Sequence, residues 1–98
     1  MKTESVKARR VVAIIEAIMT SSRLPGKVLM DICGKPALEH LVDRLKQVEA
    51  LDEIVIATTN NVDDDPVHAL AGQLDVLYYR GSESDVLGRV LGAAKSFA

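Results

Sequence analysis

Three short runs of apolar and β-branched residues divide the chain, at residues 11–15 (VVAII), 54–59 (IVIATT) and 76–79 (VLYY). None of them alternates regularly between apolar and polar positions. Continuous runs of about four to eight such residues are typical of strands that are buried on both faces, as in a parallel sheet. The pattern therefore predicts three buried, parallel strands.

The segments between and after these runs repeat apolar residues at intervals of three and four positions, which predicts helices with one buried face. The first helix is expected over residues 36–49, and the second begins at the acidic run 63–65. Carboxyl groups favour a helix start as caps and as charges at the positive end of the helix dipole. A third helix is expected after residue 85, with Ser82 or Ser84 as its cap.

Strands that alternate with helices indicate right-handed crossovers and an α/β fold. We expect a Rossmann-like three-layer sandwich with about three parallel strands and three helices. Ligands of open parallel sheets bind outside the carboxyl ends of the strands. Segments 16–27, 58–64 and 80–85 should therefore converge on one crevice.

Composition excludes several classes of partner. The 98 residues are 48% hydrophobic and 27% charged with a net charge of −2, which suits a soluble domain without a basic field for nucleic acid. No apolar run approaches the ~20 residues that cross a bilayer, so no membrane partner is expected. The single cysteine, Cys33, cannot form an internal disulfide. We expect a buried thiol in a reducing compartment, with the cytoplasm as the default.

The segment after the first predicted strand holds the densest candidate chemistry. Thr20, Ser21 and Ser22 supply hydroxyl groups, and Arg23 and Lys27 supply positive charge. Hydroxyls, backbone N–H groups and cations together suit the oxygens of a triphosphate. The spacing matches neither a Walker loop nor the glycine fingerprint of a dinucleotide fold. From the residues alone, an ordinary basic surface loop stays the alternative.

Two motifs in register extend this interpretation, and a third segment supports it. Residues 12–36 contain, in order, Ile14, Ile15, Ala17, Met19, Ser21, Ser22, Arg23, Leu24, Pro25, Gly26, Lys27, Leu29, Ile32, Gly34, Lys35 and Pro36. Residues 80–89 read RGSESDVLGR, and residues 54–59 form the second predicted strand. Over about residues 11–95 the sequence resembles the sugar nucleotidyltransferases that activate acidic sugars with CTP. It is most similar to the spore-coat polysaccharide (SpsF) branch of the acylneuraminate and deoxy-octulosonate (KDO) cytidylyltransferases.

The resemblance implies a set of nucleotide-binding positions, namely Ala17, Ser21, Ser22, Arg23, Lys27, Ser82, Asp85 and Arg89. Arg23 and Lys27 would hold the triphosphate and are the candidate catalytic residues. Ala17 would approach the nucleotide through its backbone, and the last three residues would line the base and ribose. The implied reaction is attack of a sugar hydroxyl on the α-phosphorus of CTP with release of pyrophosphate, in surface polysaccharide biosynthesis.

The sequence departs from the family pattern in two respects. Ile18 stands where the family has an arginine, so one cationic phosphate contact is missing. The family is expected to use Mg²⁺, held by an aspartate in a G-D-x-P segment, but this chain lacks that segment and the acceptor-sugar half. We therefore expect little or no turnover from the chain alone. The alternative is a non-catalytic remnant that acts as a nucleotide-binding or self-associating module.

The domain expectation is a flexible basic leader at residues 1–10 and a single nucleotide-binding domain at 11–98, truncated relative to the family. In the family, the first strand is paired on both sides, whereas here residues 11–15 would form an apolar edge. Exposed edges recruit other chains, so we expect a homo-oligomer through the first strand. His40 and His68 lack partners at metal-ligand spacing and are predicted to be surface histidines.

Overall fold

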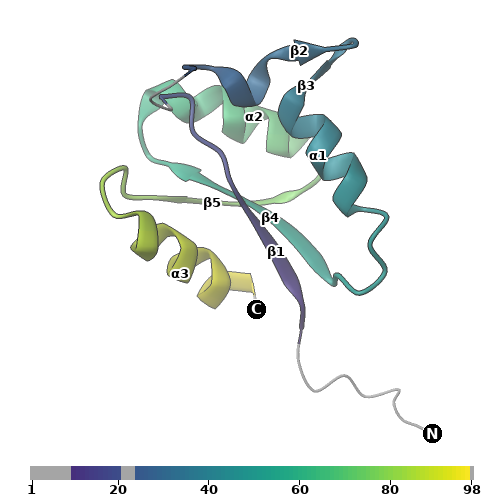
Figure 1. The fold of residues 1–98 in the computed structure, drawn as a ribbon. Coiled ribbons are helices and arrows are strands. Elements are labelled where there is room, and N and C mark those ends of the chain that lie inside the picture. The colour runs from purple at the N-terminus through teal and green to yellow at the C-terminus, as the bar shows by residue number, and fades with distance from the viewer. Residues whose placement is uncertain (1–9, 21–23, 98) are drawn as a thin grey trace, which may run out of the picture.

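The computed structural model describes residues 10–20 and 24–97, which form a layered α/β fold (Figure 1). Its main sheet contains three parallel strands in the order β1–β4–β5, with β1 at Val12–Glu16, β4 at Glu53–Thr59 and β5 at Leu77–Gly81. Each strand coincides with one of the three apolar runs to within two residues at either end. The predicted parallel sheet and Rossmann-like α/β class are confirmed.

The middle strand β4 separates two hydrophobic clusters. The helices around it are α1 (Ala37–Leu45), α2 (Asp65–Gln73) and α3 (Val86–Phe97). Ile56 packs in the cluster with residues of α1 and α2, whereas Val55 and Ala57 pack with Ala93 of α3. Successive side chains of a strand point to opposite faces, so one uninterrupted apolar run supplies both clusters.

The segment between β1 and α1 has secondary structure of its own. It contains a short 3-10 helix, η1 (Lys27–Leu29), and an antiparallel hairpin of β2 (Asp31–Ile32) and β3 (Lys35–Pro36). Cys33 and Gly34 form the turn with φ values of 52° and 88°. A two-residue hairpin turn favours this left-handed backbone and places its residues in solvent. Cys33 is exposed, so the prediction of a buried thiol is wrong.

Helix ends also differ from the expectation. Helix α1 ends at Leu45 rather than near residue 49, because the following turns tighten and Val48 N donates to Leu45 O at 3.0 Å. The carboxyl group of Asp85, not Ser82 or Ser84, accepts from Gly88 N at 2.9 Å and caps α3. Among the described residues, no helix is long and apolar enough to span a membrane.

The acidic run 63–65 lies at the start of α2 as predicted, but the side-chain cap bond in this region comes from Asn61. The side chain of Asn61 accepts from Asp63 N at 2.7 Å and caps the 3-10 helix η2 (Val62–Asp64) that precedes α2. Asp64 occupies the cap position of α2 but makes no side-chain cap bond. Its carboxyl group points elsewhere, because it is fully buried and bonded to other elements.

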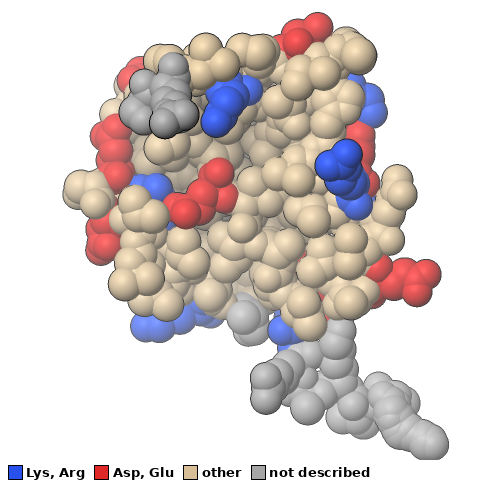
Figure 2. Space-filling model, viewed as in Figure 1, with Lys and Arg blue, Asp and Glu red and all other residues tan. Residues whose placement is uncertain are grey.

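Strand β1 is an edge strand within the described part of the chain, since β4 pairs with it on one side only. Val11 O and Ala17 N, which flank the strand, both bond toward β4. Alternate residues of a strand direct their backbone groups to opposite sides, so Val12, Ile14 and Glu16 direct theirs to the open side. In the view of Figure 2, uncharged residues cover much of the middle of the face, and most charged side chains lie toward its rim.

Candidate functional site

The carboxyl ends of the three parallel strands meet at one edge of the sheet, as the fold logic predicts. Ala17 N, just after β1, donates to Ala57 O of β4 at 3.0 Å. Asn60 N, just after β4, donates to Gly81 O of β5 at 2.9 Å. The amide of Asn61 then donates to the carboxyl group of Glu83 at 3.0 Å. The three connecting segments therefore lie side by side.

The segment that follows β1 is closed at its base by Met19 and Gly26. Gly26 N donates to Met19 O at 2.7 Å, and Gly26 has a φ of 77°, which glycine adopts without strain. Met19 N donates to the buried carboxyl group of Asp64 at 2.7 Å. The candidate residues Ser21, Ser22 and Arg23 lie outside the described residues, so their predicted phosphate contacts stay predictions. The ends of their segment are nevertheless placed at the sheet edge.

Lys27 follows this closure directly and begins η1. It is exposed and borders a cavity of about 330 Å³ together with Glu16, Ile18 and Arg89. Its side chain forms no ion pair within residues 10–20 and 24–97. Ile18, which replaces the expected arginine, borders the same cavity, so a cation at that position would lie near Lys27. Ala17 is buried, and its N–H donates to Ala57 O of β4. The predicted backbone contact between Ala17 and the nucleotide would therefore have to use another group of this residue.

Arg89 holds the segment after β5 from inside the protein. Its side chain is 2% exposed, and its guanidinium donates to Ser82 O and Glu83 O, each at 2.9 Å. The same group pairs with Glu16, at the end of β1, at 3.2 Å. Three of its bonds thus join β1, the β5–α3 segment and α3. The predicted contact between Arg89 and a nucleotide stays a prediction, but this geometry assigns most of its donors to the protein itself.

Ser82 and Asp85 lie in the segment that Arg89 fixes. Both residues are exposed, and the hydroxyl of Ser82 lies 3.3 Å from that of Ser84. Asp85 uses one oxygen to cap α3, and its carboxyl group lies over Gly88, where a Cβ would collide with it. The two residues are accessible at the predicted base and ribose side of the crevice.

Two charged residues of this edge, Asp64 and Arg80, were not assigned to the site from the sequence. Asp64 is fully buried and bonds to Met19 N and to the hydroxyl of Thr59. Arg80 donates to Thr59 O at 2.7 Å and to Asn61 O at 2.9 Å, and it pairs with Asp65 at 2.9 Å. For Arg80 the available signal is a charged residue directly after a predicted strand, since burying a charge requires a nearby partner.

The described residues do not fit the Mg²⁺ that the resemblance implies. Within residues 10–20 and 24–97, no three His, Cys, Asp or Glu side chains gather closely enough to hold a metal ion. The carboxyl group of Glu16, at the end of β1, is already engaged with Arg89, and that of Asp64, at the start of α2, with Met19 and Thr59.

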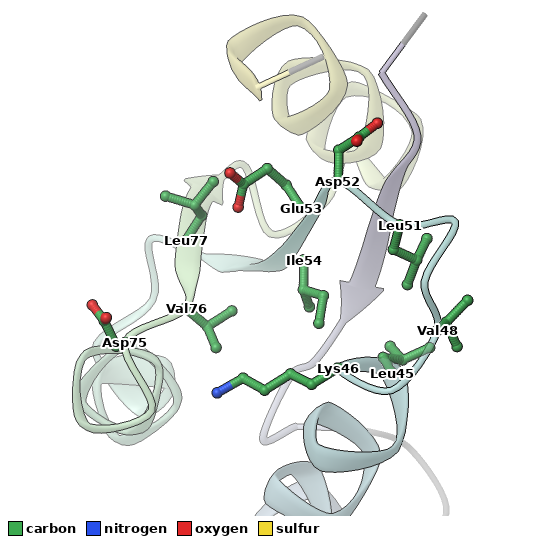
Figure 3. A pocket seen from close by; sticks show the side chains of 10 residues that line it. All are labelled: Leu45, Lys46, Val48, Leu51, Asp52, Glu53, Ile54, Asp75, Val76 and Leu77. Carbon is green, nitrogen blue, oxygen red and sulfur yellow. The ribbon is translucent and has the colours of Figure 1, made fainter. Parts of the chain in front are cut away.

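A second cavity, of about 230 Å³, opens at the opposite end of the sheet (Figure 3). Apolar side chains such as Leu45, Ile54 and Val76 line it together with the acidic residues Asp52, Glu53 and Asp75, and Lys46 reaches across it (Figure 3). The lysine ammonium donates to Leu74 O at 3.3 Å. Because this cavity lies at the amino ends of β4 and β5, it is separate from the crevice at the carboxyl ends.

Known proteins are similar to this chain in sequence and in fold. Residues 12–98 match the protein-family model described as Cytidylyltransferase. The chain is 39% identical over 89 residues to an uncharacterized protein of Methanocaldococcus jannaschii, covering 91% of this chain and 37% of that protein. It is 41% identical over 64 residues to the 3-deoxy-manno-octulosonate cytidylyltransferase of Escherichia coli, covering 65% of this chain and 26% of that enzyme.

Two solved structures superpose on almost the whole chain. One is a cytidylyltransferase from Leptospira borgpetersenii, with a TM-score of 0.83, 34% identity and coverage of 91% of this chain and 38% of that one. The other is a CMP:2-keto-3-deoxy-manno-octonic acid synthetase complexed with CTP, with a TM-score of 0.71, 29% identity and coverage of 90% and 36%. The chain therefore spans between 26% and 38% of the length of these relatives.

Proposed function

Because the chain belongs to the cytidylyltransferase family, we propose that it binds CTP at the carboxyl edge of its sheet. The observation that carries the proposal is the position of Lys27. This exposed ammonium has no ion pair among the described residues, and it borders the cavity between the ends of β1 and α3. A related synthetase was solved with CTP, and the chain superposes on it. A triphosphate would supply the negative charge that the ammonium of Lys27 lacks as a partner among the described residues.

The two connecting segments would take different parts of the nucleotide. Lys27, with Arg23 and the hydroxyls of Ser21 and Ser22, would neutralise the triphosphate. The segment that holds Ser82 and Asp85 would face the base and ribose, with Arg89 behind it as its support. Cytoplasmic location belongs to the same proposal, and the single cysteine suits a reducing compartment.

The proposed reaction belongs to the longer protein that the relatives represent. A hydroxyl oxygen of an acidic sugar would attack the α-phosphorus of CTP, forming a new O–P bond. The bond from that phosphorus to the β-phosphate oxygen would break, pyrophosphate would leave with the electron pair, and the hydroxyl proton would pass to solvent. Charge neutralisation and positioning by Lys27 and its segment would lower the barrier to this step.

A binding titration tests the proposal on the chain as it stands. CTP is added to the ¹⁵N-labelled chain, and amide shifts or heats are recorded against ribose 5-phosphate as the matched weak ligand. We expect CTP to bind more tightly, with the largest shifts at Lys27 and at residues 82–85. Equal affinity for the two ligands, or shifts confined to the cavity at the amino ends of the strands, would overturn the proposal.

Two substitutions at the cavity sharpen the titration. Lys27→Ala removes the ammonium and should weaken CTP binding about tenfold, since a charge-assisted hydrogen bond is lost. Lys95→Ala removes an equal charge from the last turn of α3 and should leave the affinity within about twofold. Ile18→Arg adds a cation beside Lys27 and should tighten binding. Unchanged affinity in both Lys27→Ala and Ile18→Arg would remove these residues from the site.

Self-association is a second proposed function, favoured by the open side of β1. That strand is mostly apolar, and its backbone groups that have no partner strand among the described residues can pair with another strand. A cavity of about 260 Å³ beside it is lined mostly by apolar side chains, including Ile15, Leu38 and Leu41. We expect a dimer by sedimentation at high concentration. Val12→Lys and Ile14→Lys should each shift it toward the monomer, and a monomeric wild type would contradict this function.

A further inference from the structure

Asp64 is a buried acidic residue that neither the helix cap nor the nucleotide chemistry above uses. It is 0% exposed, at the start of α2, and both of its oxygens accept hydrogen bonds from other elements. Oδ1 accepts from Met19 N at 2.7 Å, and Oδ2 accepts from the hydroxyl of Thr59. The hydroxyl oxygen of Thr59 in turn accepts from Asn61 N at 3.1 Å. The orientation of the carboxyl group is therefore fixed on two sides.

Met19 is the point at which this carboxyl group meets the segment after β1. Its N–H donates to Asp64, and its carbonyl accepts from Gly26 N at 2.7 Å. Lys27 is the next residue, and its own N–H donates to Leu24 O at 3.1 Å. A continuous series of described contacts thus runs from the core through Asp64, Met19 and Gly26 to Lys27.

An acidic residue in the core is not the most stabilising choice for packing alone. Burying a carboxyl group is unfavourable unless every oxygen finds a donor, and an apolar side chain of similar size packs without that requirement. A backbone N–H left without an acceptor inside the protein is also unfavourable. The carboxyl group of Asp64 removes this problem for Met19, whose N–H is directed away from the sheet ladder. Asp64 therefore stabilises the segment after β1 more than it stabilises the packing of the core.

From this series we propose that Asp64 is a positioning residue that holds Lys27 at the crevice by fixing the Met19–Gly26 closure. The inference rests on the CTP binding proposed above, in that Lys27 is the group being positioned. Asp64 itself does not touch the nucleotide. Its removal should leave the sheet in place and release the closure, so that Lys27 no longer approaches the triphosphate in a defined geometry.

The test compares three variants at two acidic positions by CTP titration, at a temperature where each variant is fully folded by circular dichroism. Asp64→Ala should raise the dissociation constant for CTP about tenfold, because Met19 N–H loses its acceptor. Asp64→Asn keeps one acceptor oxygen and should raise it about threefold. Asp63→Asn removes the same charge from the exposed neighbouring residue and should change it by less than about twofold. Equal affinities in all three variants would overturn the proposal.

A purely structural role is distinguished by Thr59→Val, which removes the other partner of Asp64 but keeps the bond to Met19. If Asp64 only stabilises the fold, the loss of CTP affinity should follow the loss of unfolding stability in both Asp64→Ala and Thr59→Val. If Asp64 positions Lys27, Asp64→Ala should lose several times more affinity than Thr59→Val at the same loss of stability. Proportional losses in the two variants would overturn the inference.

Hydrogen exchange separates failure of this inference from failure of the proposed function. In the ligand-free chain, Asp64→Asn should speed exchange at the amides of Met19 and Gly26 at least about fivefold, with little change at Ile56 in β4. Unchanged exchange at both amides would overturn the inference even if CTP binds. If the wild type binds no CTP, the proposed function fails, and the exchange rates alone decide whether Asp64 fixes the closure. If Asp64→Ala does not fold, the CTP titration and the exchange measurement are both made on Asp64→Asn.

Discussion

Two segments at the same edge of the sheet are fastened by buried residues of opposite charge. The segment after β1 presents a backbone N–H, and a carboxyl group holds it through the bond from Met19 to Asp64. The segment after β5 presents two carbonyl groups, and the guanidinium of Arg89 holds both. Each anchor therefore matches the hydrogen-bonding groups that its segment offers. A donor-rich arginine suits carbonyls, and an acceptor-only carboxyl group suits an N–H.

The two anchors also differ in where they lie along the chain. Asp64 is 45 residues from Met19, so its bond exists only because β4 places the two segments together. Arg89 is six and seven residues from the carbonyls that it holds, within one turn-and-helix unit. It also reaches Glu16, 73 residues away, and so connects the two segments. The bond from Met19 to Asp64 therefore depends wholly on the tertiary fold, whereas the bonds from Arg89 to Ser82 and Glu83 are local in sequence.

Removal of Arg89 should cause the largest loss of stability. Arg89→Met keeps much of the side-chain length but leaves two carbonyl groups and Glu16 without their donor. We expect the free energy of unfolding to fall by about 3 kcal/mol. Arg44→Met replaces an exposed arginine of α1 and should cost less than about 0.5 kcal/mol. Urea denaturation measures both, and equal losses would show that the guanidinium does not fasten the β5–α3 segment.

A methyl group at Gly81 should disturb the same anchor less strongly. A Cβ there would lie 2.9 Å from Cγ of Arg89 and 3.1 Å from the ring of Tyr79. Arg89 cannot move aside without releasing its bonds, so Gly81→Ala should cost roughly 1–2 kcal/mol. Gly72→Ala meets no atom within 4 Å in α2 and should gain up to about 1 kcal/mol. Thermal unfolding of the two variants should give shifts of opposite sign, and shifts of the same sign would contradict this account.

The cap of α3 provides a smaller test of the segment after β5. Asp85→Ala removes the acceptor for Gly88 N and should lower the free energy of unfolding by about 1 kcal/mol. Ser84→Ala should change it by only a few tenths of a kcal/mol, because Ser84 makes no cap bond to the helix in this structure. Chemical denaturation distinguishes the two, and a larger loss for Ser84→Ala would restore the serine cap expected from the sequence.

An exposed ion pair should have the smallest effect, in contrast with the two buried anchors. The hydrogen bond from Lys35, 2.8 Å away, lowers the pKa of Asp43 below its usual range. A carboxyl group with a lowered folded-state pKa stabilises the protein above its unfolded-state pKa. That contribution is lost as the pH falls through the folded-state value, below about 4. Thermal unfolding between about pH 2 and 6 should show a slightly smaller acid-induced loss in Asp43→Asn than in the wild type. A larger loss in the variant would contradict the sign.

Much of the fold could be predicted because its signals are local. Each buried strand corresponds to a continuous apolar run in the sequence, and the segments between the runs indicate the β-α order. That order places the ends of β1, β4 and β5 at one edge, so the sequence alone predicts where the crevice lies. The boundaries of α1 and the capping residue of α3 were less well predicted. Several side chains of similar chemistry compete for those positions, and small differences in turn geometry select among them.

The sequence by itself therefore determined the strands, the parallel sheet and the edge at which Lys27 lies. The tertiary structure decided how that edge is held. Cys33 became exposed because a two-residue turn forms there, and Arg89 was directed inward because carbonyls after β5 surround it. Asp64 acquired its role only when β4 brought it to Met19. Apolar periodicity is a property of neighbouring residues, whereas the partner of a buried charge is set by which distant segments meet.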